Sequence, residues 1–208
     1  MIPIPTLSTF LATSLLLAMV PGPDNIFVLT QSALRGRSAG IWVTLGLCTG
    51  LVVHTCAVAL GVAALFQAST LAFNALKTVG AAYLFYLAWQ AFRASATGIR
   101  LGRDSNLGSW QLYRRGIIMN LTNPKVSIFF LAFLPQFADP VRASLSTQLL
   151  LLGGLFIVAT LLVFAGIALL AGSIGQRLGQ SEKAGRIMNW VAGTVFAALA
   201  LKLATTAR

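Results

Sequence analysis

Six long runs of apolar residues constrain the fold of this chain more than any other feature. They cover residues 6–34, 39–66, 69–92, 116–137, 144–173 and 184–204. A helix needs about 20 mostly apolar residues to cross a bilayer, and each run is long enough. Only 9% of the residues are charged, whereas soluble domains carry about 25%. We therefore expect an all-α polytopic membrane protein with six transmembrane helices.

The basic residues predict the orientation of these spans. The chain has 15 basic and four acidic residues, for a net charge of +11. Ten basic residues follow the first, third and fifth runs, and four lie on the other side of the bilayer. The positive-inside rule then places both termini outside. A nucleic-acid binder gathers its basic residues on a solvated face, so no nucleic-acid partner is expected.

The long basic connection divides the chain into two halves of three spans. We expect one transporter domain over residues 1–208, with repeat one at about 1–95, a cytoplasmic loop at about 93–115 and repeat two at about 116–208. An odd number of spans per half inverts the second repeat relative to the first. The first run of each half is broken at proline, in "VPGPDN" and in "LTNPKV". Broken segments at matched positions of inverted halves point to a transporter's binding site.

The first break places an acidic residue in the middle of a span. Pro21 and Pro23 lack an N–H and Gly22 allows the backbone to bend, so carbonyl groups are left unpaired before a new half-helix begins. Asp24 is costly near the bilayer centre unless it has a polar environment, and Asn25 follows it. Two interpretations fit: Asp24 caps the new half-helix, or it binds a substrate or a proton.

The second break repeats this pattern with a basic residue. Pro124 pushes Asn123 out of helical geometry, and the amides of Asn120 and Asn123 could bond the backbone groups that this frees. Lys125 could extend to the membrane interface, since its stem is long. Alternatively, Lys125 and Asp24 face one cavity near the midplane, where they would bind the carboxylate and the ammonium of a zwitterion.

The second run carries a stripe of small residues at three- and four-residue steps. Gly46, Gly50 and Gly61 lie on it, and small residues at this spacing let helices approach closely. The packing could be within one bundle or between two copies of the chain. His54 lies on the same stripe, either hydrogen-bonded between helices or acting in proton relay or substrate contact.

Other classes of function find less support. The chain has one histidine, no serine in a recognisable nucleophile motif and no metal-ligand cluster, so neither an enzyme, a metal site nor a cofactor is expected. The beginning of the chain lacks the positive segment of a signal peptide, so we expect the first run to be retained. An ion exporter or channel is the alternative to a carrier, because broken helices also line ion paths.

Several stretches resemble the LysE/RhtB family of bacterial amino-acid exporters, in its RhtB-like branch. They are "PGPDN", "ALRGRSAG", "GLCTGLVVH", "LKTVGAAYLFYLAWQAFR" and "GIIMNLTNPKVSIFFLAFLPQF", in this order. The resemblance implies a small secondary transporter of the bacterial inner membrane, with both termini in the periplasm. It exports amino acids or their derivatives, driven by the proton gradient. Neutral cargo such as homoserine, threonine or leucine is expected over dibasic cargo. The family's two motifs fall on residues 21–24 and 123–125.

Overall fold

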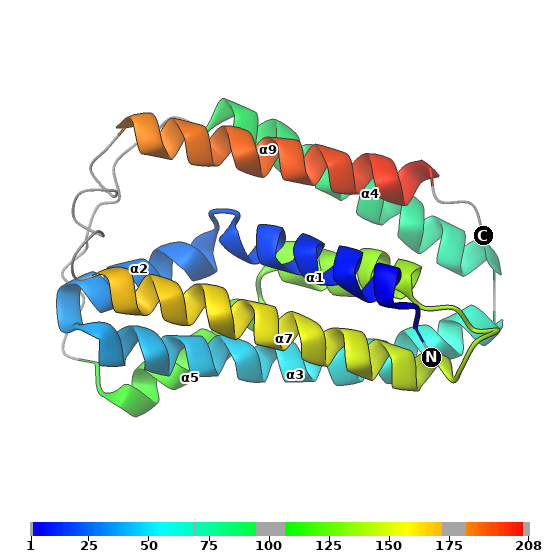
Figure 1. Cartoon of the computed structure of the whole chain (residues 1–208), viewed down its shortest axis with the longest axis horizontal. Coiled ribbons are helices and arrows are strands. Elements are labelled where there is room, and N and C mark those ends of the chain that lie inside the picture. The colour runs from blue at the N-terminus through cyan, green and yellow to red at the C-terminus, as the bar shows by residue number, and fades with distance from the viewer. Residues whose placement is uncertain (1, 69, 95–106, 172–181, 206–208) are drawn as a thin grey trace.

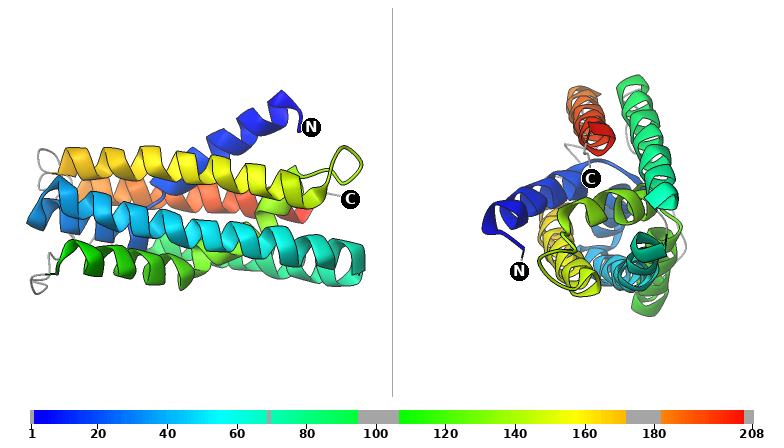
Figure 2. Two further views of the ribbon diagram at one scale, coloured as in Figure 1. Left: turned by 90° about the horizontal axis from the view of Figure 1, so that it is seen from below. Right: turned by 90° about the vertical axis from the view of Figure 1, so that its right-hand side faces the viewer.

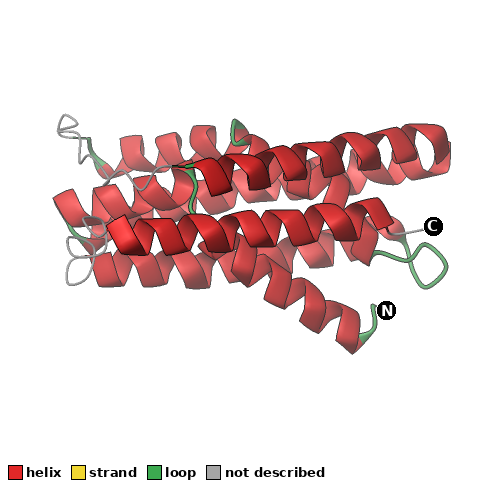
Figure 3. Ribbon diagram, turned by 90° about the horizontal axis from the view of Figure 1, so that it is seen from above, coloured by secondary structure: helices red, strands yellow, loops and turns green. Residues whose placement is uncertain are grey.

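The described part of the chain is built of helices. The computed structural model describes residues 2–68, 70–94, 107–171 and 182–205, and Figure 3 shows that the regular elements in these ranges are helical. The first half contains α1 (Ile4–Met19), α2 (Pro23–Arg35), α3 (Arg37–Ala68) and α4 (Thr70–Arg93). The second half contains α5 (Ser109–Leu121), α6 (Pro124–Ile128), the π-helical turn η1 (Phe129–Phe133), the 3-10 turn η2 (Leu134–Phe137), α7 (Leu145–Leu170) and α9 (Glu182–Thr205).

Both expected helix breaks are present. The pair α1 and α2 is bent by 59°, and α5 and the segment from Pro124 to Phe137 are bent by 50°. Three helices are long and apolar enough to cross a membrane, and the number rises to five if each bent pair is one span. Helix α4 is not among them. Membrane spanning is thus supported for three to five segments, and the expected six are not confirmed.

The fourth apolar run begins earlier than predicted. Helix α5 starts at Ser109 rather than near residue 116, so its first turns come from the expected cytoplasmic loop. The side chain of Gln111 accepts a hydrogen bond from the N–H of Gly108 at 2.9 Å, and Leu112 is buried. This capping contact and this buried residue let a sequence that is polar by composition continue as helix.

The helices form a bundle with an additional pair at its side. Helix α3 packs along α5 and α7, and α1 packs on α7, while α4 packs along α9. Figure 1 and the end-on view of Figure 2 show α4 and α9 together, beside the bundle of the other helices. The start of α1 and the end of α9 lie at the same end of the molecule (Figure 1).

A cluster of phenylalanines fills the core at the second break. Phe129 lies 5.1 Å from Phe133 and 5.0 Å from Phe156, measured between ring centroids, and Phe130 lies 5.3 Å from Phe156. Phe10 of α1 joins the cluster at 6.3 Å from Phe129. All five rings are buried. The segment after the second break is therefore held between α1 and α7 by aromatic packing.

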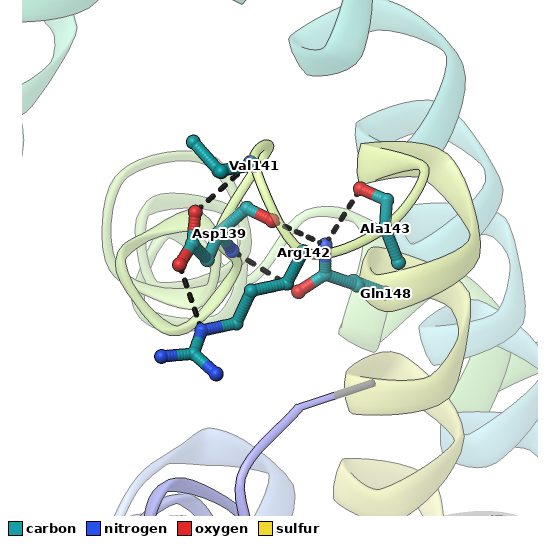
Figure 4. Close-up of polar contacts among 5 residues, drawn as sticks. All are labelled: Asp139, Val141, Arg142, Ala143 and Gln148. Atoms are coloured by element: carbon teal, nitrogen blue, oxygen red, sulfur yellow. Dashed lines mark hydrogen bonds and ion pairs between the residues drawn. The ribbon is translucent and has the colours of Figure 1, made fainter.

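The connection from η2 to α7 is fixed by one buried glutamine. The amide of Gln148 donates to the carbonyl oxygens of Asp139 and Ala143 at 2.7 and 2.9 Å, and its oxygen accepts from the N–H of Asp139 at 3.0 Å. The Asp139 carboxylate accepts from the N–H of Val141 and pairs with Arg142 at 2.9 Å. Figure 4 shows how these contacts close the loop over the start of α7.

Candidate functional site

The first break separates α1 from α2 by three residues. Helix α1 ends at Met19, and α2 begins at Pro23 after Gly22, which has extended backbone and provides no side-chain cap. The first hydrogen bond of α2 runs from the N–H of Ile26 to the carbonyl of Gly22 at 3.0 Å. The carbonyls at the end of α1 need other donors, as they do at every helix end.

Side chains supply these donors, one of them from the other half of the chain. The ammonium of Lys125 donates to the carbonyl oxygen of Leu17 at 3.1 Å and to that of Val20 at 3.0 Å. The Asn25 amide donates to the carbonyl oxygen of Ala18 at 2.6 Å. Lys125 therefore points inward and caps the end of α1, rather than extending to the membrane interface.

The second break is capped by its own asparagine. Helix α5 ends at Leu121, and α6 begins at Pro124 with Asn123 as its N-cap. The side-chain oxygen of Asn123 accepts a hydrogen bond from the N–H of Lys125 at 3.1 Å. The expectation that Asn123 bonds a freed backbone group is correct. Because this contact fixes the start of α6, it also fixes the direction in which Lys125 leaves the backbone.

Asp24 is buried where the two breaks meet. Its side chain is 4% exposed, and its Oδ2 accepts a hydrogen bond from the amide of Asn120 in α5 at 3.4 Å. The Asn120 side chain was expected to bond backbone groups, and it bonds this carboxyl group instead. Asn123 and Lys125 also interact with Asp24 from the second half. The site is thus built from residues of both halves.

Several polar atoms in this site are buried without a hydrogen-bond partner. They are Oδ1 of Asp24, Oδ1 of Asn25, Oδ1 of Asn120 and Nδ2 of Asn123. An unpaired buried polar group costs about 1–3 kcal/mol, and these four atoms lie around the two breaks. Oε1 of Gln31 in α2 and Oγ1 of Thr160 in α7 are also unpaired.

His54 lies at the edge of the site, in α3. Its Nε2 is 3.4 Å from the carbonyl oxygen of Asn120, and its ring centroid is 5.6 Å from that of Phe130. The side chain is half-buried. These contacts join α3 to both sides of the second break, as the interpretation of a histidine hydrogen-bonded between helices requires. A part in proton relay or substrate contact stays a prediction.

Glycines bring α3 close to α5 at the level of the site. A Cβ at Gly50 would lie 2.7 Å from Oδ1 of Asn120, and one at Gly46 would overlap the backbone of Tyr113. Gly61 is different, because it is exposed and a Cβ there would meet no described atom within 4 Å. The expected helix packing at Gly61 therefore stays a prediction.

The structure brings together the expected residues of both motifs. Asp24, Asn25, Asn120, Asn123 and Lys125 form one cluster. Gln31 and Thr160 belong to no motif, and their burial without partners could be found only in three dimensions. Within the described ranges, no three histidine, cysteine, aspartate or glutamate side chains are arranged to hold a metal ion.

A family model, that of the LysE type translocators, matches residues 15–207 of the chain. The chain belongs to this family. It is a membrane transporter and not an enzyme, and its proline-broken helices agree with the family resemblance of its two motifs. Known relatives match 94–95% of its length. No solved structure matches it significantly.

Three relatives illustrate the range of named functions. The chain is 36% identical over 196 residues to a homoserine/homoserine lactone efflux protein of Salmonella typhimurium, covering 94% of each chain. It is 32% identical over 196 residues to an uncharacterized membrane protein of Vibrio cholerae, covering 94% of this chain and 95% of the relative. It is 27% identical over 198 residues to a leucine efflux protein of Salmonella choleraesuis, covering 95% of this chain and 93% of the relative.

Proposed function

We propose that this transporter exports neutral amino acids or their derivatives from the bacterial cytoplasm. Relatives named for the efflux of homoserine, homoserine lactone and leucine support this class of cargo. All of these compounds are neutral outside their α-groups. The described site contains a single carboxyl group, that of Asp24, which suits one ammonium. A dibasic amino acid would bring a second cation that finds no acidic partner there.

The observation that carries this proposal is the set of unpaired atoms at the two breaks. Oδ1 of Asp24, Asn25 and Asn120 are three acceptors, and an ammonium has three N–H donors. Nδ2 of Asn123 is a further donor, and it lies beside the Asp24 carboxyl group. The N–H groups of Asp24 and Asn25 precede the first hydrogen bond of α2, and such groups at a helix start bind anions. The free groups thus complement a zwitterion.

Lys125 is not the main partner of the substrate carboxylate, although its charge suggests that role. Its ammonium is engaged by two carbonyl groups of α1, so in this account it fixes the first break and keeps a positive charge near the substrate carboxylate. It is a positioning residue for Asp24 and for the start of α2. The substrate carboxylate then binds mainly to N–H donors.

Alternating access follows from the way the two halves pack. Exchanging α1 and α2 with α5 and α6, α3 with α7, and α4 with α9 maps several of the main packing pairs onto one another, whereas the extensive α2–α3 packing has only the weaker packing of η2 on α7 as its counterpart. The pairs α3–α7 and α4–α9 map onto themselves, and α1–α7 corresponds to α5–α3. This pairing supports a single domain of two inverted repeats with α4 as a sixth span, in which rocking of the halves exposes the site to each side in turn.

Asp24 is the residue that couples the export of the amino acid to the inward movement of a proton. A proton that Asp24 takes from the outside removes its negative charge, and the attraction for the substrate ammonium is lost. The amino acid is then released outside, while the proton continues inward and leaves the carboxylate ready for new cargo. Both termini are periplasmic in this scheme, and the basic residues near the ends of α2, α4 and α5 face the cytoplasm.

The experiment that tests this function measures export from cells supplied with a panel of dipeptides. Cells that overproduce the protein cleave each dipeptide, and the medium is assayed for the released amino acid over time. Faster release of neutral amino acids is expected, with loss in Asp24→Asn. Asp139→Asn is the matched control, because Asp139 lies in the loop before α7 and away from the breaks. Full gradient-driven export by Asp24→Asn would contradict the role of Asp24.

A further inference from the structure

Thr160 in α7 has a buried hydroxyl that is not used by its own helix. Five serines and threonines are buried in the described helices. Ser14, Ser32, Thr44 and Thr55 donate to the carbonyl four residues earlier, at 2.7–2.8 Å. This is the usual solution for a hydroxyl inside a helix. Thr160 is 3% exposed, and its Oγ1 has no partner. Its hydroxyl is therefore turned away from the backbone of α7.

Glycine contacts fix the register between α7 and α3. A Cβ at Gly40 would lie 2.9 Å from Cβ of Ala168, and one at Gly153 would overlap Thr55. Fifteen residues separate the two contact points on each helix, so the helices are antiparallel and in register. Thr160 precedes Ala168 by eight residues, and residue 48 follows Gly40 by eight, so Thr160 lies level with residue 48 of α3. This is about 3 Å from the level of Gly50, where α3 meets Asn120.

The same contact relates α7 to α2. A Cβ at Gly40 would also overlap the side chain of Ser32 in α2, so Ser32 and Ala168 share a level. Helices α2 and α7 end toward the same side of the bundle (Figure 1) and pack on each other. Asp24 precedes Ser32 by eight residues, and Thr160 precedes Ala168 by eight, so Asp24 and Thr160 lie at the same level. The alignment of α7 with α3 and its alignment with α2 therefore both place Thr160 at the level of the site.

Helical periodicity places the side chain of Thr160 on the inner face of α7. Thr160 is seven residues from Gly153 and eight from Ala168, which is about two turns from each. Both of these residues face α3. Thr160 therefore lies on the face of α7 that packs against α3, at the level of the groups proposed to bind the substrate's ammonium and carboxylate.

We propose that Thr160 contacts the substrate's side chain and selects amino acids whose side chain carries a hydroxyl or carbonyl oxygen over purely aliphatic ones. This inference rests on the proposed export of neutral amino acids. With the α-groups held at the breaks, the side chain of the substrate extends toward α7. A buried hydroxyl left unpaired by an aliphatic side chain disfavours that substrate, and this is how polar pockets discriminate.

The test compares Thr160→Val with Thr160→Ser in proteoliposomes, measuring counterflow of homoserine and of leucine. Valine keeps the shape and removes the hydroxyl, whereas serine keeps the hydroxyl. We expect Thr160→Val to lower the ratio of homoserine to leucine transport about tenfold or more. Thr160→Ser should leave the ratio within about twofold. Thr55→Val is the control, since the Thr55 hydroxyl bonds its own helix.

An unchanged ratio in Thr160→Val, or an equal loss for both amino acids, would overturn the proposal for Thr160 alone. The proposed function fails separately, if the wild-type protein transports neither amino acid or if Asp24→Asn transports both normally. A second measurement places Cys at position 160 in a chain without Cys48 and Cys56. Homoserine should slow the reaction of this thiol with N-ethylmaleimide, and it should not do so when Asp24→Asn is added. Labelling that is insensitive to homoserine would also overturn the proposal.

Discussion

The Nζ of Lys125 lies 3.0 Å from the carbonyl oxygen of Val20, so a lysine of the second broken helix closes the end of the first. A cation inside a membrane segment is costly unless it is paired. Here the partner is the carbonyl end of α1, which carries the negative end of the helix dipole. The two breaks are thus one structural unit, and each half of the chain depends on the other.

Lys125→Met is expected to destabilise the protein and not only to impair transport. Removing the ammonium leaves the carbonyls of Leu17 and Val20 without donors, and each unpaired buried group costs about 1–3 kcal/mol. Thermal unfolding of the purified protein in detergent should shift to a lower temperature. Lys183→Met, at an exposed position near the start of α9, should have no effect. Equal unfolding temperatures for the two variants would contradict the capping role of Lys125.

Gly50→Ala is expected to disturb the site through Asn120. The new methyl group would lie 2.7 Å from Oδ1 of Asn120, so this side chain must move and its hydrogen bond to Asp24 is weakened. Overpacking of this kind costs about 1–3 kcal/mol, and export should fall as well. A Cβ at Gly154 would meet no described atom within 4 Å, and Gly154→Ala is the matched control. If Gly50→Ala exported as fast as this control, the close approach would have no bearing on the site.

Gln148→Leu is expected to lower stability without changing the choice of substrate. Three hydrogen bonds to the loop before α7 are lost, and backbone groups of Asp139 and Ala143 are left unpaired. The free energy of unfolding should fall by about 2 kcal/mol or more. Thr147→Val changes the exposed neighbour and serves as the control. A Gln148→Leu protein as stable as this control would show that the loop contacts contribute little.

The number of spans can be tested with fusions to alkaline phosphatase, which needs the periplasm to form its disulfides. Six spans with periplasmic termini predict an active enzyme when it is fused after Thr205. A fusion after Arg93, at the end of α4, should be inactive. Activity after Arg93 together with no activity after Thr205 would mean that α4 does not cross the membrane and that the two halves are not inverted repeats of three spans.

The sequence predicts the helix breaks and most of the site, because proline and glycine act locally. Pro21, Gly22, Pro23 and Pro124 interrupt their helices whatever surrounds them. Asp24 could be assigned to a polar site from the cost of a charge in an apolar run. The helical nature of the other segments followed from their apolar composition in the same way.

The contacts between halves could not be predicted, because they depend on how distant segments pack. The sequence places Lys125 beside Pro124, but it does not say that the ammonium reaches the end of α1. Gly61 lies on the same stripe as Gly46 and Gly50, but a Cβ there would meet no described atom within 4 Å. Thr160 lies in an apolar run like any helical threonine, and only its missing hydrogen bond distinguishes it.

The central claim is that one saturable site, built from both breaks, carries the amino acid across the membrane. Counterflow tests it most directly: proteoliposomes loaded with unlabelled homoserine are diluted into labelled homoserine. The wild-type protein and Asp139→Asn should accumulate label transiently, whereas Asp24→Asn and Asn123→Leu should lose at least about nine-tenths of this uptake, as expected for about 1.4 kcal/mol or more of lost binding. Full counterflow in Asp24→Asn, or uptake that rises linearly with concentration as in a channel, would contradict the account.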